Sequence, residues 1–141
     1  MTSGQNVSVR ERQGTSGLYT NDISVRGHNI IADEPQSLGG ADLGPTPFEY
    51  LSAALGACTT ITLRMYAARK KWSVAHIACD VVHETQTSAD GKMADVFIRH
   101  ITLNGALDID QRARMIEIAR KCPVHKTLSH SSKIETIEVT V

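Results

Sequence analysis

The sequence has no excess of charge of either sign. Fifteen Lys and Arg residues balance fifteen Asp and Glu residues, so the formal net charge at pH 7 is zero. Nucleic acids and anionic lipids attract proteins mainly through clustered positive charge, and no such bias is present here. We therefore expect neither a nucleic acid nor a membrane surface as partner.

Long apolar runs and a readable targeting segment are also missing. The first seven residues have neither a basic nor an apolar region, so they do not resemble a secretory signal. The longest apolar stretch, residues 50–68, is interrupted by Ser52, Arg64 and several Thr. This composition is typical of a buried helix and not of a membrane span. We expect a cytoplasmic protein.

Cysteine is scarce, and its count of three is odd. A chain of 141 residues can remove roughly 70% of its unfolded surface from water, so its core needs neither disulfides nor a structural metal. In a reducing compartment, cysteine pairs are more often catalytic or metal-binding than structural. The three cysteines are therefore candidates for chemistry.

The N-terminal part alternates β-prone and polar residues between glycine turns. Over residues 5–33 this pattern predicts a three-stranded meander. Residues 33–47 follow with three Pro and three Gly, which predicts a shaped loop without a regular element.

A long central helix is predicted over about residues 47–70. Thr46 can be its N-cap, with Pro47 at the first helical position and Glu49 completing a capping box. Residues 51–61 are apolar or small nearly all round, which indicates an interior helix.

The C-terminal part, residues 72–141, is predicted to contain three strands and one helix. The helix is capped by Asp108 with Gln111 and should end at Cys122, because Pro123 disfavours helical geometry in the preceding residue. The strands are expected at residues 72–84, 93–103 and 134–141. The order of elements predicts a single α+β domain over residues 1–141.

Local sequence alone leaves the roles of the cysteines open. Cys58 lies deep in the predicted helix, where it could be a small buried hydrophobe, and a reactive thiol there would need a nearby cation. Cys122 lies at a helix end before proline, where packing and presentation for chemistry are both plausible. Cys79 alternates with Ile77 and Val81, which favours the core.

A zinc site is a further alternative. Cys122 and His125 are three residues apart, a spacing that metal ligands use. A zinc site would need two or more further ligands, for instance Cys58 with His130 or His28. Since no second paired ligand motif is present, we expect no metal.

Glu49 and Cys58 cannot serve one site within a single helix. Nine residues at about 100° each place them on opposite faces, more than about 10 Å apart along the axis. If both belong to one site, Glu49 must come from a second subunit, most simply through antiparallel packing of two copies of this helix.

Two segments of the chain resemble the OsmC/Ohr family of peroxide-reducing proteins, and its OsmC-like branch in particular. The first comprises residues 27–35 and 39–66, with Gly44-Pro-Thr-Pro-Phe-Glu49 and Cys58. The second comprises residues 105–108 and 117–128, with Cys122-Pro-Val-His125. The two motifs occur in the family's order, and the resemblance extends over essentially the whole chain.

The resemblance implies an OsmC-like fold, in which antiparallel sheets wrap around a long central helix in an intertwined homodimer with active sites at the subunit interface. It places Cys58 on the peroxidatic cysteine, Cys122 on the resolving cysteine and Glu49 on the carboxylate that orients an arginine. That arginine has no unambiguous match: Arg26 is favoured, with Arg10 and Arg12 as alternatives.

The implied activity is thiol-dependent reduction of organic hydroperoxides, and of hydrogen peroxide as a further substrate. It needs an external thiol as reductant and no cofactor. Two alternatives remain at this point. The chain could be a non-catalytic small-ligand-binding or stress-associated protein that keeps the fold, or its cysteines could form a purely structural disulfide.

Overall fold

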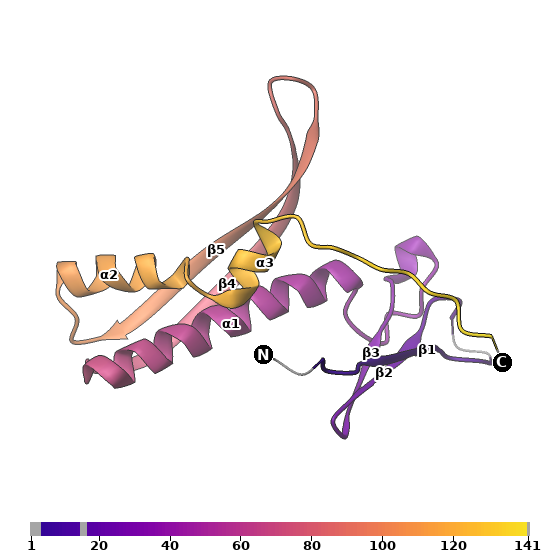
Figure 1. Ribbon diagram of the computed structural model, residues 1–141, viewed down its shortest axis with the longest axis horizontal. Coiled ribbons are helices and arrows are strands. Elements are labelled where there is room, and N and C mark those ends of the chain that lie inside the picture. Colours follow the sequence, from indigo (N-terminus) through magenta and orange to yellow (C-terminus); the bar gives the residue numbers. More distant parts are fainter. Residues whose placement is uncertain (1–3, 15–16, 141) are drawn as a thin grey trace. The chain divides into compact units, whose positions relative to one another are not determined.

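The computed structural model describes residues 4–14 and 17–140, and it has the mixed α+β composition that the sequence predicts (Figure 1). The chain forms two compact units, Met1–Leu51 and Ser52–Val141. We call them the N-terminal unit and the C-terminal unit and describe each by itself.

The N-terminal unit contains the predicted meander. Strands β1 (Ser8–Glu11), β2 (Asn21–Val25) and β3 (His28–Ala32) pair antiparallel in the order β1-β2-β3. Arg26 and Gly27 form the two-residue turn between β2 and β3, with φ angles of 49° and 82°. Positive φ at both positions is characteristic of the type I′ turn, which matches the twist of the flanking strands.

A buried carboxylate organises the Pro- and Gly-rich loop after β3. Asp33 is 2% exposed and accepts hydrogen bonds from Thr20 Oγ1 at 2.8 Å, Glu34 N at 2.8 Å and Leu43 N at 3.2 Å. Burial opposes ionisation, but these hydrogen bonds outweigh it and lower the pKa of the Asp33 carboxyl. The loop is irregular as predicted, apart from one 3₁₀ turn, η1 (Gln36–Leu38).

The central helix α1 spans Pro47–Lys70, in agreement with the prediction. Its capping box is present: Glu49 N donates to Thr46 Oγ1 at 3.2 Å, and Thr46 N donates to Glu49 Oε1 at 3.1 Å. The two hydrogen bonds satisfy backbone donors that would otherwise be unpaired at the helix start.

The C-terminal unit is built on a long antiparallel hairpin of β4 (Val74–Thr87) and β5 (Met93–Gly105). Both strands were predicted, although each ends two or three residues further on. Helix α2 (Ile109–Ala119) follows, with the predicted capping box of Asp108 and Gln111.

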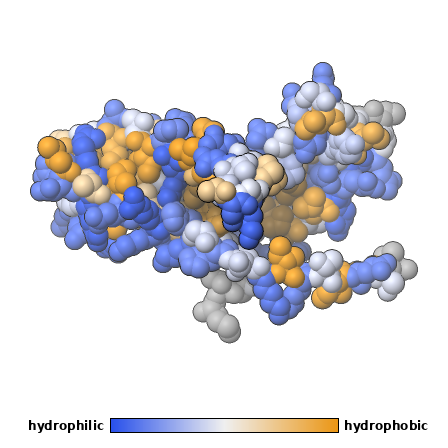
Figure 2. All heavy atoms as spheres, turned by 90° about the horizontal axis from the view of Figure 1, so that it is seen from above, coloured by the Kyte–Doolittle hydropathy of each residue, from blue (hydrophilic) through white to orange (hydrophobic). Residues whose placement is uncertain are grey.

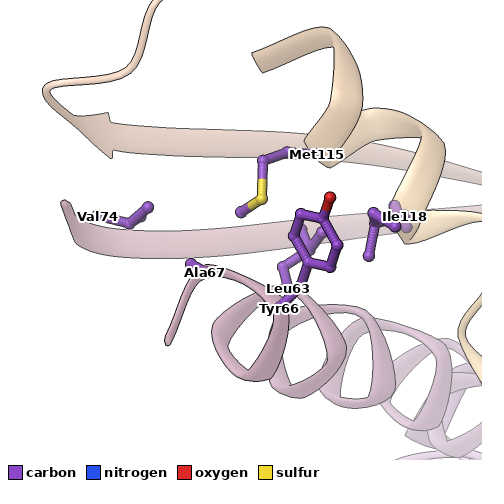
Figure 3. Packing of buried hydrophobic residues seen from close by; sticks show 7 residues of the cluster. Leu63, Tyr66, Ala67, Val74, Met115 and Ile118 are labelled. Carbon is purple, nitrogen blue, oxygen red and sulfur yellow. The ribbon is translucent and has the colours of Figure 1, made fainter. Parts of the chain in front are cut away.

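The core of this unit lies where α1 and α2 meet the hairpin (Figure 3). Leu63 and Met115 are fully buried there. The other members of the cluster are Tyr66, Ala67, Val74, Ile118 and Ala119.

The end of α2 differs from the prediction. The helix ends at Ala119 and not at Cys122, and a separate short helix, α3 (Pro123–Leu128), begins directly after the cysteine. Pro123 ends one helix and starts the next, because its fixed φ suits the first helical position. Cys122 is therefore the N-cap of α3.

The predicted last strand, residues 134–141, is wrong over the residues described. Residues 131–140 have no regular structure and make no strand pairing, and position 141 lies outside the described range. Alternation alone predicts a strand, but a strand also needs an adjacent edge for its backbone hydrogen bonds. Ile134, Ile137 and Val139 instead remain 80–85% exposed.

Apolar side chains also remain on one side of α1. Within the C-terminal unit, Ile61 is 59% and Met65 is 68% exposed, and Ala53, Ala54 and Ala57 are exposed beside them. Figure 2 shows apolar surface in several patches among hydrophilic side chains. No helix in the described part of the chain combines the length and apolar character needed to cross a membrane.

Candidate functional site

The structure brings Cys58 and Cys122 together in the C-terminal unit. Cys58 lies half-buried on α1, and Cys122 is completely buried between α2 and α3. The two thiols are within hydrogen-bonding reach of each other. A separation of 64 positions in sequence gave no indication of this contact.

Cys122 is held by the first turn of α3. The backbone N–H of His125 donates to Cys122 Sγ at 3.3 Å. Since Cys122 replaces the Ser, Thr, Asp or Asn usual at an N-cap, its sulfur satisfies a backbone donor and is fixed in direction.

The surroundings of Cys122 favour the neutral thiol. Burial raises the pKa of Cys122, and the adjacent Cys58 thiol raises it further. The hydrogen bonds from the α3 backbone oppose this increase without reversing it. Cys122 therefore has the environment of a protected thiol.

Arg99 connects the segments that carry the two cysteines. Its Nη1 donates to Thr59 Oγ1 at 3.1 Å and to the Ala119 carbonyl at 2.8 Å, and its Nη2 contacts His125 Nδ1 at 2.7 Å. The guanidinium is half-buried, and no carboxylate lies within ion-pairing distance of it in the part of the chain that the structure describes. Its positive charge is thus left to act on neutral neighbours.

The contact with Arg99 defines the state of His125. Arginine has no acceptor, so His125 Nδ1 must accept the hydrogen bond and its ring proton must lie on Nε2. Burial, and then the positive charge of Arg99, lower the pKa of His125. The imidazole is neutral near pH 7.

Cys79 lies on the inner face of the hairpin, as the alternation predicts, and it adjoins the same group of residues. It is half-buried, and its thiol lies near the hydroxyl of Thr59. Burial raises the pKa of Cys79, while the charge of Arg99 opposes the increase. All three cysteines are free thiols.

A cavity of about 240 Å³ lies beside this group, between α1, β5 and α3. Its walls are mainly apolar, and one turn of α1 separates Leu55 in the wall from Cys58. His125 and Ser129 supply polar groups, and the remaining lining residues are Asp95, Val96, Phe97 and Leu128.

The candidate arginines and Glu49 lie in the N-terminal unit. Arg26 is exposed on the β2–β3 turn, and Arg12 forms an ion pair with Asp22 at 2.6 Å. Arg10 donates to the adjacent Val9 carbonyl at 3.5 Å. The Glu49 carboxylate accepts the capping hydrogen bond from Thr46 N. The part these four residues play stays a prediction.

The zinc alternative gains no ligand set from the structure. Among residues 4–14 and 17–140, no group of three or more His, Cys, Asp and Glu side chains is arranged to hold a metal ion. His125 Nδ1, one possible ligand atom, faces the Arg99 guanidinium instead.

Sequence analysis did not identify Arg99 or Thr59 as site residues. A signal was present for Arg99, because it alternates with Phe97, Ile101 and Leu103 on the apolar face of a predicted strand. A long charged side chain at such a position is rarely buried unless other groups pair with it. Nothing in the sequence singles out Thr59 from its threonine neighbours.

The fold and the motifs agree with known proteins. A family model for OsmC-like proteins matches residues 39–137. An OsmC-like protein from Mycoplasma pneumoniae is 18% identical with a TM-score of 0.73, and the match covers 92% of this chain and 89% of that one. No curated protein matches the chain.

Two further solved structures show the same fold. An organic hydroperoxide resistance protein OsmC from Legionella pneumophila is 16% identical with a TM-score of 0.67, covering 89% of each chain. The organic hydroperoxide resistance protein OhrB of Bacillus subtilis is 18% identical with a TM-score of 0.59, covering 88% of this chain and 89% of its own. Because the family model spans most of the chain, including both cysteine motifs, the chain belongs to the OsmC-like protein family.

Proposed function

We propose that the protein is a thiol-dependent peroxidase that reduces organic hydroperoxides through Cys58 and Cys122. The observation that carries the proposal is the contact between a half-buried thiol on α1 and a fully buried thiol before α3. The names of the Legionella and Bacillus proteins of the same fold point to the same substrate class.

The reaction proceeds in three balanced steps. The Cys58 thiolate attacks one oxygen of the O–O bond, giving a sulfenic acid on Cys58 and an alkoxide that takes a proton and leaves as the alcohol. The Cys122 thiol then condenses with the sulfenic acid, giving the Cys58–Cys122 disulfide and water. Two external thiols finally reduce the disulfide through a mixed disulfide and are themselves oxidised.

The two cysteines suit different roles because of their surroundings. Cys58 is the more accessible thiol and would meet the peroxide first. Cys122 is buried and favours the neutral form, so it is itself protected from peroxide while it lies beside the sulfenic acid. Rapid disulfide formation would protect Cys58 from further oxidation.

Activation of Cys58 is assigned to an arginine and to Glu49 across a homodimer. Arg26 is the favoured cation, with Arg10 and Arg12 as alternatives, and Glu49 would come from the second copy. Uncovered apolar side chains on α1 and in residues 131–140 support a second copy as the partner, because water contact with them is unfavourable.

An organic substrate is favoured over hydrogen peroxide by the apolar cavity next to the dithiol. Leu55, Phe97 and Leu128 offer an alkyl tail a surface that hydrogen peroxide could not use. The reducing thiol would be supplied by a reducing compartment, for which we propose the cytoplasm.

Mass spectrometry of the intact protein tests the proposal. One equivalent of an organic hydroperoxide should remove two hydrogens, and peptide mapping should locate a Cys58–Cys122 disulfide. Cys58→Ser should abolish hydroperoxide consumption, whereas Cys122→Ser should turn over once and then accumulate sulfinic acid on Cys58. Sustained turnover of Cys122→Ser with a reductant specific for disulfides would contradict the resolving role.

A further inference from the structure

Arg99 contacts both of the segments that carry the reactive dithiol. Thr59, which follows Cys58 directly, accepts from Nη1 at 3.1 Å. The Ala119 carbonyl, three residues before Cys122, accepts from the same nitrogen at 2.8 Å. His125, three residues after Cys122, accepts from Nη2 at 2.7 Å. One side chain therefore spans α1, the end of α2 and the start of α3.

We infer that Arg99 is a positioning residue for the dithiol. It keeps Cys58 and Cys122 close enough to form a disulfide, because it ties the Ala119 carbonyl and the His125 side chain, on the two sides of Cys122, to the Thr59 side chain on the helical turn that carries Cys58. This inference deepens the proposed function and rests on it for the identity of the two cysteines.

The contacts of the acceptors show why a clamp at this place can act on both sulfurs. Thr59 is completely buried and donates its own hydroxyl proton to the Leu55 carbonyl at 2.7 Å, so its position is fixed to α1. On the other side, His125 binds Nη2 of Arg99 through its ring and also donates its backbone N–H to Cys122 Sγ at 3.3 Å. Movement of the guanidinium would therefore shift the anchor of each cysteine.

The connection between α2 and α3 gives such a clamp a physical purpose. Only Arg120, Lys121 and Cys122 separate the two helices, and Pro123 prevents a continuous helix through them. Without an anchor at Ala119 and His125, this junction could change its backbone angles and move Cys122 away from α1. The planar guanidinium fixes several acceptors at once, which a lysine ammonium does less well.

The redox equilibrium of the cysteine pair tests the clamp without any peroxide. The protein is equilibrated with mixtures of reduced and oxidised glutathione, and the fraction of Cys58–Cys122 disulfide is measured by peptide mapping. Arg99→Met should reduce the equilibrium constant for disulfide formation at least about tenfold, because hydrogen bonds from a charged donor no longer hold the two sulfurs together. Arg99→Lys should recover only part of the loss.

Two further variants keep the test decisive. Thr59→Val removes one acceptor at almost constant volume and should lower the constant by roughly threefold, even if Arg99→Met fails to fold. Arg112→Met is the matched control. Arg112 also binds two backbone carbonyls, of Leu103 at 2.9 Å and Gly105 at 3.3 Å, but touches neither cysteine segment. The equilibrium constant for disulfide formation in Arg112→Met should stay within about twofold of the wild-type value.

An Arg99→Met variant with the wild-type equilibrium constant would overturn the inference, as would an equal loss in Arg112→Met or a wild-type protein that forms no Cys58–Cys122 disulfide. A wild-type protein that forms this disulfide with glutathione but consumes no hydroperoxide would contradict the proposed function alone.

Discussion

At the scale of single residues, the candidate site combines thiols with a cation that no carboxylate neutralises within the described residues. Arg99 approaches Cys79 closely enough to act on its pKa, and it contacts the neighbours of Cys58 and Cys122. A partly desolvated positive charge stabilises negative charge on sulfur more strongly than an exposed one. The C-terminal unit thus contains a cation for thiol chemistry in addition to those predicted from the N-terminal strands.

The first prediction concerns the pH dependence of Cys122. Its folded-state pKa lies above the value of 9.0 for an ordinary thiol, mainly because of burial. As pH rises through about 9, the unfolded chain loses this proton before the folded protein does, so the free energy of unfolding should fall. Below that pH, the stability contributed by the protonated Cys122 thiol is fully present. Urea unfolding at pH 8 and pH 10 should show a larger decrease in wild type than in Cys122→Ser.

Alkylation gives an independent measurement of the same property. Iodoacetamide at pH 8 should modify the half-buried Cys58 first and Cys122 only slowly, because Cys122 is inaccessible as well as protonated. In urea both should react at similar rates. Equal rates for Cys122 in the folded and unfolded protein would contradict the prediction.

The residues of the site were predictable to different degrees. Cys58 and Cys122 stand in motifs whose resemblance to a family pointed to them, and the structure places them together. The role of Arg99 depends on contacts with residues 20 to 40 positions away, which no local pattern encodes. Its only local sign is the interruption of an apolar alternation.

At the scale of elements, the close approach of α1 to the hairpin determines where Cys58 lies. Gly56 is buried, and a methyl group placed on it would be 3.4 Å from the Cys79 carbonyl oxygen and from Val81 Cγ2. This distance is an ordinary contact, so one carbon fits and a longer side chain does not. The small residue sets the distance between helix and strand.

The effect of replacing Gly56 on the free energy of unfolding should therefore depend on the size of the new side chain. Gly56→Ala should raise the free energy of unfolding by up to about 1 kcal/mol, since alanine favours the helix and meets no clash. Gly56→Leu should lower it by about 1–3 kcal/mol, because the side chain must displace β4. Denaturant titrations measure both, with the exposed Ala68→Leu as a control. Equal stability of the two Gly56 variants would show that α1 does not pack closely at this position.

Most elements could be predicted because local signals and tertiary packing agree. The capping boxes at Thr46 and Asp108 fixed the starts of two helices, and alternation identified the hairpin strands. The sequence did not predict the end of α2 or the existence of α3, because a proline both ends a preceding helix and suits the first position of a new one, and the local pattern indicates only the first of these roles. The final strand was wrong because alternation does not indicate whether a pairing edge is available.

At the scale of the whole molecule, several large apolar side chains lie close together on the surface and are exposed to water. In the C-terminal unit they lie on the exposed side of α1, with Ile61 and Met65, and in the unpaired residues 131–140. Surfaces of this kind generally mark an interaction site. They are the physical basis for expecting a homodimer.

We therefore predict that the protein is a homodimer in solution. Light scattering after size exclusion should give twice the mass of the 15.3 kDa chain. Replacing Ile134, Ile137 and Val139 together by Ser should shift the equilibrium towards the monomer and reduce peroxidase activity, because Glu49 would no longer reach the second copy's Cys58. Lys133→Ser is the control on the same segment. A monomeric wild type with full activity would refute the dimer and the shared site.

The number of cysteines allows the products of oxidation to be distinguished by counting the thiols that remain. Three thiols in one chain cannot all pair within it, so an oxidised subunit with one disulfide keeps a single titratable sulfhydryl. A colorimetric thiol count in denaturant would fall from three to one for the disulfide, to two for a single sulfinic acid, and to zero only if the remaining thiol were also crosslinked or oxidised. The number of thiols lost, two for the disulfide and one for a sulfinic acid, thus separates the productive cycle from over-oxidation.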